Sequence, residues 1–310
     1  MQAKPLTLIY NEKSGSKLNN SQFDVAQIVD YFQAHGFDVQ SFILDEINYF
    51  DQHMQTILHR HLEAEDRGVI VSAGGDGTLN AIARHLLHHP IPLGILPLGT
   101  FNYVARLWQI PLGALDAAKV IATGKTQSIH VACINQQIYL NNASLGLYPL
   151  FIQRREHYNR YFGRFPLHAY TSALDVLIRH ADELKLAFSI DGQRYPVQTP
   201  LIFMGNNQLQ LQDLNLKIAA DVAQGLLAGL VVNKQQRLNI VKLLWLLVRG
   251  KIEQAKDVYS FSAKTLTIES QAKLLTVALD GEIFKMPPPL NFYVAQHALK
   301  IMVPHDFTSV

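Results

Sequence analysis

The chain has little that could cross-link it or hold it in a membrane. Its 310 residues include one cysteine, Cys133, which excludes an internal disulfide framework and a cysteine zinc cluster. The longest apolar run, residues 243–248, is far shorter than the roughly 20 residues that a spanning helix needs. Residues 1–5 carry no apolar signal segment before a strand-like stretch at 6–10. These features predict a cytoplasmic protein.

Neither sign of charge is in large excess. The 27 basic and 25 acidic residues give a formal net charge of +2, whereas a nucleic-acid-binding protein normally carries a concentrated basic face. The histidines at 53–61 and 85–89 lack an HExxH arrangement, so we interpret them as solvated or capping residues rather than zinc ligands. The length and the 48% of hydrophobic residues favour a globular protein of two domains, without a nucleic-acid partner.

The most informative segment is the glycine-rich stretch at residues 74–80. It follows the apolar run 69–73, and apolar residues at 79, 82, 83, 86 and 87 then recur with a helical period. A strand, a glycine turn and a helix start are thus predicted in that order, and a helix N-terminus attracts phosphate. Neither the dinucleotide fingerprint nor the P-loop pattern fits the stretch. The simplest alternative is a tight strand-to-helix connection.

Asp76 lies inside this stretch and changes the expected ligand. A carboxylate beside a phosphate is repulsive unless a cation lies between them. The segment therefore predicts a metal-bridged triphosphate rather than a bare pyrophosphate.

The pattern of predicted elements changes near residue 127. Before it, strand-like segments at 6–10, 37–42, 69–73 and 91–97 alternate with helix-like segments, as in a parallel α/β sheet. After it, short strand-like segments separated by turns indicate a mostly antiparallel β domain with helices at 166–180 and 236–248. We predict an α/β nucleotide-binding domain at 1–127 and a β-rich, sandwich-like domain at 128–296, with 297–310 returning to the first domain.

Six ordered motifs resemble those of the soluble diacylglycerol kinase family, which includes bacterial lipid kinases and the sphingosine kinases. The resemblance covers nearly the whole chain, whereas the Gly-Asp-Gly loop alone also occurs in NAD kinases. The motifs are residues 11–15, 74–80, 97–106, 142–146, 205–206 and 280–282.

The resemblance implies a lipid kinase that uses ATP and Mg²⁺ and phosphorylates diacylglycerol or a related lipid. It implies that Asp280 or Glu282 takes the proton from the lipid hydroxyl. On the residues alone, Asp280-Gly281 is typical of a hairpin turn. Asn11, Ser14, Thr100 and Asn102 are equally typical of caps and turns. The nucleotide-binding residues that the resemblance implies are Asn11, Lys13, Ser14, Gly15, Gly74, Gly75, Asp76, Gly77, Thr78, Asn80, Thr100 and Asn102.

Two departures from the family pattern concern metal binding. Tyr103 stands where the family commonly has an aspartate, and Gln224 stands where an aspartate helps hold a structural metal. Asp76 and Asp221 remain as the expected metal ligands. The departures keep open a non-catalytic nucleotide- or lipid-binding relative. The Gly-Asp-Gly loop, which NAD kinases share, keeps open a soluble-substrate kinase of that kind.

Residues 151–165 interleave four arginines with five aromatic residues. This mixture suits peripheral contact with anionic lipids at the inner face of the membrane, or else a packing segment between domains. The expected partner is a lipid such as diacylglycerol. The sequence leaves the oligomeric state open, with a homodimer among the options.

Overall fold

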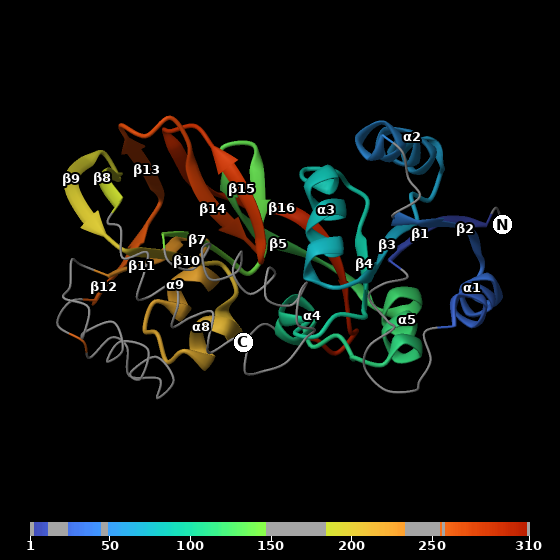
Figure 1. The fold of residues 1–310 in the computed structure, drawn as a ribbon. Helices are drawn as coiled ribbons and strands as arrows, with labels where there is room; N and C mark the ends of the chain where they lie inside the picture. Colours follow the sequence, from blue (N-terminus) through green and yellow to red (C-terminus); the bar gives the residue numbers. More distant parts are fainter. Residues whose placement is uncertain are drawn as a thin grey trace, which may run out of the picture. The chain divides into compact units, whose positions relative to one another are not determined.

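The computed structural model describes residues 3–11, 24–44, 49–146, 184–232, 255 and 258–308. They divide into two compact units (Figure 1). Unit 1 comprises residues 1–131 and 296–310, and unit 2 comprises residues 132–295. The predicted limits were 127 and 297, so each division falls within four residues of its predicted place. Two long strands, β5 (Lys125–Ile134) and β16 (Leu290–Val303), contribute residues to both units.

Unit 1 is built on parallel strands in the order β2-β1-β3-β4, and the end of β16 pairs parallel to β4. Helices α2 and α3 lie on one face of the sheet, and α1 and α5 lie on the other (Figure 1). The strands are β1 (Lys4–Tyr10), β2 (Phe37–Ile43), β3 (Val69–Gly74) and β4 (Leu93–Pro97). The helices are α1 (Val25–Ala34), α2 (Phe50–Glu63), α3 (Asp76–Leu86), α4 (Tyr103–Leu107) and α5 (Ala114–Thr123).

Local sequence explains the elements that lead to the glycine stretch. Every residue of β3 is buried, because helices cover both faces of a parallel sheet. In α3, residues Leu79, Ile82, Ala83 and Leu86 are buried at the predicted helical spacing. Because both elements are held by burial, the turn between them is fixed at the carboxyl end of the sheet.

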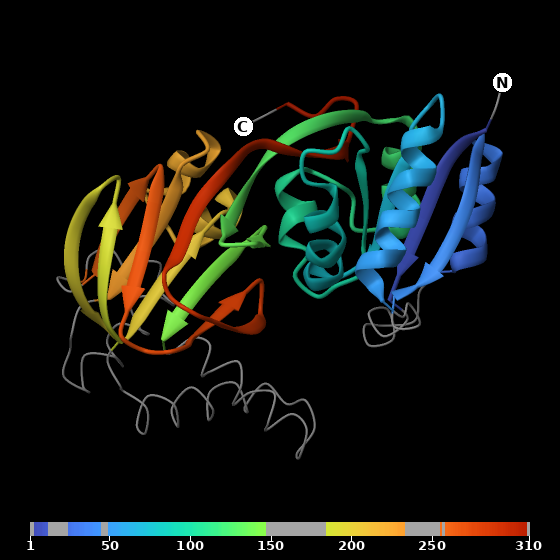
Figure 2. The ribbon, with the colours of Figure 1, turned by 90° about the horizontal axis from the view of Figure 1, so that it is seen from above.

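Unit 2 is a sandwich of two sheets with an apolar core between them (Figure 2). One sheet has the antiparallel order β12-β11-β10-β7-β14-β15, and the facing strands are β16, β13, β8 and β9. Leu145, Met204 and Val277 from one sheet pack in the same cluster as Phe188 and Phe292 from the other. The strands are β6 (Gln137–Tyr139), β7 (Asn142–Gly146), β8 (Leu184–Ile190), β9 (Gln193–Thr199), β10 (Leu201–Gly205), β11 (Leu227–Val232), β12 (Val258–Ala263), β13 (Thr265–Ser270), β14 (Leu275–Leu279) and β15 (Glu282–Met286).

Two short helices, α8 (Gln208–Asp213) and α9 (Ala219–Ala223), cover β10 and β11 through a second apolar cluster. The sequence reading missed both, because five or six residues are too few to show a helical period. The helices predicted at 166–180 and 236–248 lie outside the described residues. Within the described part of the chain, no helix is both long and apolar enough to cross a membrane.

Candidate functional site

The glycine stretch joins β3 to α3 as expected. Gly75 is the N-cap of α3 in an extended conformation (φ −87°, ψ −176°), and it offers no side chain to the first turn. The Leu79 N–H donates to the Gly75 carbonyl over 3.0 Å, which starts the helix. Asp76 and Gly77 therefore lie in the first turn, where the helix dipole favours an anion.

The Thr78 side chain packs against Gly74 in this turn. A Cβ placed on Gly74 would lie 2.5 Å from the Thr78 hydroxyl oxygen, and the Thr78 side chain is buried. Only glycine at position 74 leaves room for that side chain. We therefore assign the Thr78 side chain to packing beneath the turn, although the sequence reading placed it among the nucleotide contacts.

A second turn, residues 97–102, lies against the first. A Cβ on Gly99 would come within 2.6 Å of the Gly75 Cα, so the two backbones touch through glycines. Asn102 has a left-handed conformation (φ 49°), and its amide oxygen accepts the Gly99 N–H over 3.0 Å. Its amide nitrogen donates to the Pro97 and Gly99 carbonyls over 3.3 and 2.8 Å. The Asn102 side chain thus holds its own turn in shape, whereas Thr100 is exposed.

The two turns border a small hollow that is open to solvent. Ser72, a residue that sequence reasoning missed, lies at its wall, and its buried hydroxyl has no hydrogen-bond partner within the described part of the chain. An unpartnered buried hydroxyl is costly unless a ligand or water satisfies it. The sequence signal for Ser72 was its place as a polar residue in the otherwise apolar run 69–73. The lining residues are Ser72, Gly74, Gly75, Asp76, Leu79, Ile95, Pro97, Asn102 and Ala105.

Asn11 reaches the same edge of the sheet from β1, since its N–H donates to the Ala73 carbonyl over 3.1 Å. Asn80 is half-buried in α3. Lys13, Ser14 and Gly15 lie outside the described residues. The predicted nucleotide-binding residues that the structure describes therefore gather at the carboxyl ends of β1, β3 and β4.

Asp280 in unit 2 has its carboxylate surrounded by backbone donors. Its Oδ2 accepts the Leu140 N–H over 2.7 Å, and its Oδ1 accepts those of Asn141 and Asn142 over 2.8 and 3.0 Å. Asp280 also donates its own N–H to the Asn142 carbonyl over 2.9 Å. The carboxylate therefore joins the β14–β15 turn to the start of β7.

A second hairpin of unit 2 repeats this arrangement. Asp191-Gly192 joins β8 to β9 with φ values of 47° and 87°, and Asp280-Gly281 joins β14 to β15 with 47° and 91°. Asp191 Oδ1 accepts the Lys264 and Thr265 N–H groups over 3.0 and 2.9 Å. The match supports the hairpin-turn interpretation of Asp280 and assigns its carboxylate to holding backbone. Glu282, the exposed first residue of β15, is then the better candidate for the base.

The motifs at 142–146 and 205–206 meet through a network of amides. Strands β7 and β10 are paired, with Asn142 opposite Gly205. The Asn142 amide nitrogen donates to Gln210 Oε1 over 3.0 Å, and that of Asn207 donates to Asn141 Oδ1 over 2.9 Å. Sequence reasoning missed Asn141, Asn207 and Gln210. Asn141 and Asn207 are 66 positions apart, so only the folded sheet brings them together.

Comparison with known proteins accounts for both units. Residues 5–134 match the model of the diacylglycerol kinase catalytic domain, and residues 153–303 match that of the YegS C-terminal NAD kinase beta sandwich-like domain. The chain belongs to the diacylglycerol kinase family. Diacylglycerol kinases of Staphylococcus aureus strains JH9 and Newman are each 24% identical over 309 residues, which span 99% of this chain and 94% of the relative.

Solved structures show the same fold. A putative diacylglycerol kinase from Bacillus anthracis str. Sterne superposes with a TM-score of 0.72 at 20% identity, covering 99% of this chain and 100% of that one. A second structure of a diacylglycerol kinase from that organism gives 0.69 at 21% identity. The family assignment confirms the predicted architecture of an α/β domain followed by a β sandwich-like domain.

The metal ligands expected from the family pattern are in different surroundings. Asp221 lies in α9 of unit 2, where its carboxylate accepts the Ser262 hydroxyl proton. Among the residues that the structure describes, no three of His, Cys, Asp and Glu are grouped as a metal site. Both metal-ligand expectations stay predictions. For Asp76, Mg²⁺ is commonly held by one or two carboxylates together with substrate phosphates, and Asp76 lines the hollow beside the glycine turn.

Proposed function

We propose that this family member is an ATP-dependent lipid kinase, which transfers the γ-phosphoryl group of ATP to the hydroxyl of diacylglycerol or a related lipid. The observation that carries the proposal is the glycine turn at the start of α3, with Asp76 and the Ser72 hydroxyl at the hollow beside it. The names of the curated relatives support the reaction class.

Unit 1 supplies the phosphate site in this proposal. The triphosphate lies against Gly75 and Gly77 at the positive end of α3, and glycine lets the backbone approach it closely. Asp76 would hold Mg²⁺, and the bound ion would neutralise charge on the phosphate oxygens. Ser72 contributes a hydroxyl to the polar shell of the phosphates.

Unit 2 supplies the proton acceptor. Glu282 takes the proton as the lipid O–H bond breaks, the lipid oxygen forms a bond to the γ-phosphorus, and the bond to the bridging oxygen of ADP breaks. Asp280 is not the base in this proposal, because three backbone N–H groups bond to its carboxylate and stabilise its charged form. Its role is to hold the turn from which Glu282 begins β15.

A second candidate, a non-catalytic nucleotide-binding relative, is favoured by specific observations. Tyr103 occupies the position at which the family commonly has an aspartate, and Asp221 is bonded to Ser262. The proposed kinase must therefore work with Asp76 as its one described acidic ligand near the phosphates. Only turnover distinguishes the two candidates.

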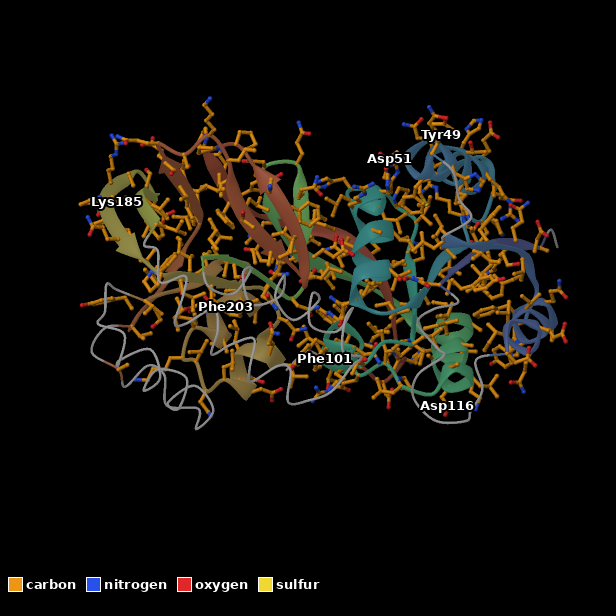
Figure 3. All side chains as sticks on the ribbon, viewed as in Figure 1. Tyr49, Asp51, Phe101, Asp116, Lys185 and Phe203 are labelled. Atoms are coloured by element: carbon orange, nitrogen blue, oxygen red, sulfur yellow. The ribbon has the colours of Figure 1, made fainter. Side chains whose placement is uncertain are left out.

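The test is transfer of labelled γ-phosphate from ATP to vesicles that contain diacylglycerol, monoacylglycerol or sphingosine, with NAD as a soluble acceptor. We expect label in at least one lipid and a loss of about 100-fold or more in Asp76→Asn. Asp116→Asn is the matched control, because Asp116 also lies in the first turn of a helix with a glycine N-cap (Figure 3). It is expected to keep the wild-type rate.

Other outcomes separate the alternatives. Label in NAD but in no lipid would favour the NAD kinase-like reading. Nucleotide binding without transfer to any acceptor would favour the non-catalytic relative.

A further inference from the structure

Two aromatic residues, Phe101 and Tyr103, flank Asn102, which lines the hollow. Phe101 is 58% exposed, and its ring lies nearly parallel to that of Tyr103, with centroids 5.9 Å apart and an angle of 10° between the planes. The Arg106 guanidinium carbon lies 5.5 Å from the centre of the Tyr103 ring. Figure 3 marks Phe101 at this turn. We call these three residues the aromatic platform.

The platform is held in place by its neighbours. The three hydrogen bonds of the Asn102 side chain fix the backbone between the two rings. The Arg106 cation over the Tyr103 face restrains the second ring. Because Phe101 is 58% exposed, more than half of this side chain is open to contact with a ligand.

The position of the platform indicates which ligand it meets. Asn102 and Ala105, from the same turn and helix, line the hollow together with Gly75 and Asp76. A ribose separates the base of a nucleotide from its phosphates, so a base site must lie beside the phosphate site and not within it. The platform meets this condition within unit 1. Arg106 also adds positive charge next to a polyphosphate.

We infer that the aromatic platform is the base subsite of the nucleotide site, with a purine stacked on Phe101. This inference rests on the proposed function, since it requires phosphates at the glycine turn. Purine is the favoured class because a larger base covers more of the exposed ring. Tyr103 then supports the Phe101 ring by packing parallel to it, at the position where the family commonly has an aspartate.

The test compares two ligands that share a polyphosphate and differ in the base. Isothermal titration calorimetry measures the Kd of ATP and of inorganic tripolyphosphate for the wild type and for Phe101→Ala. Loss of one stacking partner is expected to raise the Kd of ATP by roughly ten-fold, within a range of about 5- to 150-fold. The Kd of tripolyphosphate is expected to change less than about two-fold, because the glycine turn is unaltered.

Two further variants sharpen the result. Tyr259→Ala removes a ring that is also 58% exposed but lies in unit 2, and it should leave both Kd values unchanged. Phe101→Trp should restore ATP binding to within a few-fold of wild type. Its indole fluorescence should be quenched by ATP and not by tripolyphosphate.

Several results would overturn the inference. Unchanged ATP binding in Phe101→Ala would remove the base from the platform, and so would equal weakening of both ligands, which reports damage to the turn. Loss of co-sedimentation with phosphatidylglycerol vesicles at an unchanged Kd for ATP would instead assign Phe101 to a lipid surface. A wild type that binds neither ATP nor tripolyphosphate would refute the proposed function itself, which is a distinguishable outcome.

Discussion

Asp76-Gly77 in unit 1 and Asp280-Gly281 in unit 2 each follow a strand, but the chain continues differently after each. Asp76 is the first residue of helix α3 and one of the residues that line the hollow. After Asp280 the chain turns back as β15, and the carboxylate accepts three backbone N–H groups. The same dipeptide thus begins a helix beside the proposed phosphate site in one unit and closes a hairpin that holds backbone in the other.

The difference arises from the backbone at the aspartate. Asp280 has a positive φ, as two-residue hairpin turns require, and this conformation directs its carboxylate towards the neighbouring strand ends. Asp76 follows a glycine N-cap, so the dipole of α3 lies beside its carboxylate. A motif that contains Asp-Gly therefore gains its function from the element that follows it.

The largest effect that would test this comparison is on turnover. Glu282→Gln keeps the shape of the side chain but cannot accept the lipid proton. We expect kcat to fall by about 100- to 10,000-fold, whereas the Kd of ATP and the Tm stay near wild type because Glu282 is exposed. Steady-state transfer assays, calorimetry and thermal melts check the three quantities.

Glu269→Gln is the control for the loss of a carboxylate, because Glu269 is a partly exposed glutamate of the same unit, paired with Arg194. It should keep full activity. A Glu282→Gln variant that turns over at the wild-type rate would show that the base lies elsewhere in the chain.

An intermediate effect is expected on stability. In Asp280→Asn the amide nitrogen has to face a backbone N–H that the carboxylate now bonds, so at least one charge-assisted bond is lost. We expect the free energy of unfolding to fall by about 1.5 to 3 kcal/mol. Denaturant titration followed by circular dichroism measures the change.

Asp191→Asn is the matched variant, since its turn has the same φ but its hydrogen bonds are exposed. Its loss should be less than about 1 kcal/mol, because water replaces exposed bonds. If Asp280→Asn instead abolishes transfer without lowering stability, Asp280 takes part in the chemistry and the distinction between the two Asp-Gly pairs fails.

The fold could largely be predicted from local patterns. The apolar run 69–73 and the helical spacing after residue 79 are each visible within one short segment of the sequence. The structure has β3 and α3 at these places. The change to antiparallel strands near residue 127 was likewise visible in short runs and turns. These features depend on neighbours in sequence, which is why they could be predicted.

The details of the site depend on partners that are distant in sequence. The role of Asp280 is set by Leu140 and its two neighbours, about 140 positions earlier, and the bond between Asp221 and Ser262 spans 41 positions. Ser72 becomes a candidate ligand contact only because β4 and the second turn line the same hollow in the folded chain. No spacing rule contains these pairings, so sequence reasoning could not foresee the Ser262 partner of Asp221.

The smallest effect is expected on the pH dependence of stability, through a buried pair of polar side chains in unit 1. His61 and Thr7 are fully buried, with His61 Nε2 2.9 Å from the Thr7 hydroxyl oxygen and Nδ1 2.6 Å from the Arg67 carbonyl. Nδ1 must donate to that carbonyl, so in the neutral ring Nε2 accepts the Thr7 hydroxyl proton. Burial lowers the pKa of His61 below its usual 6.5, and the nearby Arg60 charge lowers it further.

Because the folded-state pKa is lowered, the unfolded chain binds more protons below pH 6.5. The stability contribution is complete above pH 6.5 and is lost as the pH falls, by at most about 1.4 kcal/mol per pH unit. In His61→Gln an amide can donate to Arg67 and accept from Thr7 without titrating. We expect its Tm to fall less than that of wild type between pH 7.5 and 5.5, measured by scanning calorimetry.

His59→Gln, which removes an exposed histidine of the same helix, should follow the wild-type curve. Parallel curves for wild type and His61→Gln would mean that His61 is not the group whose protonation destabilises unit 1. His85 and His130, the other histidines of the described residues with a lowered pKa, would then be substituted in the same way.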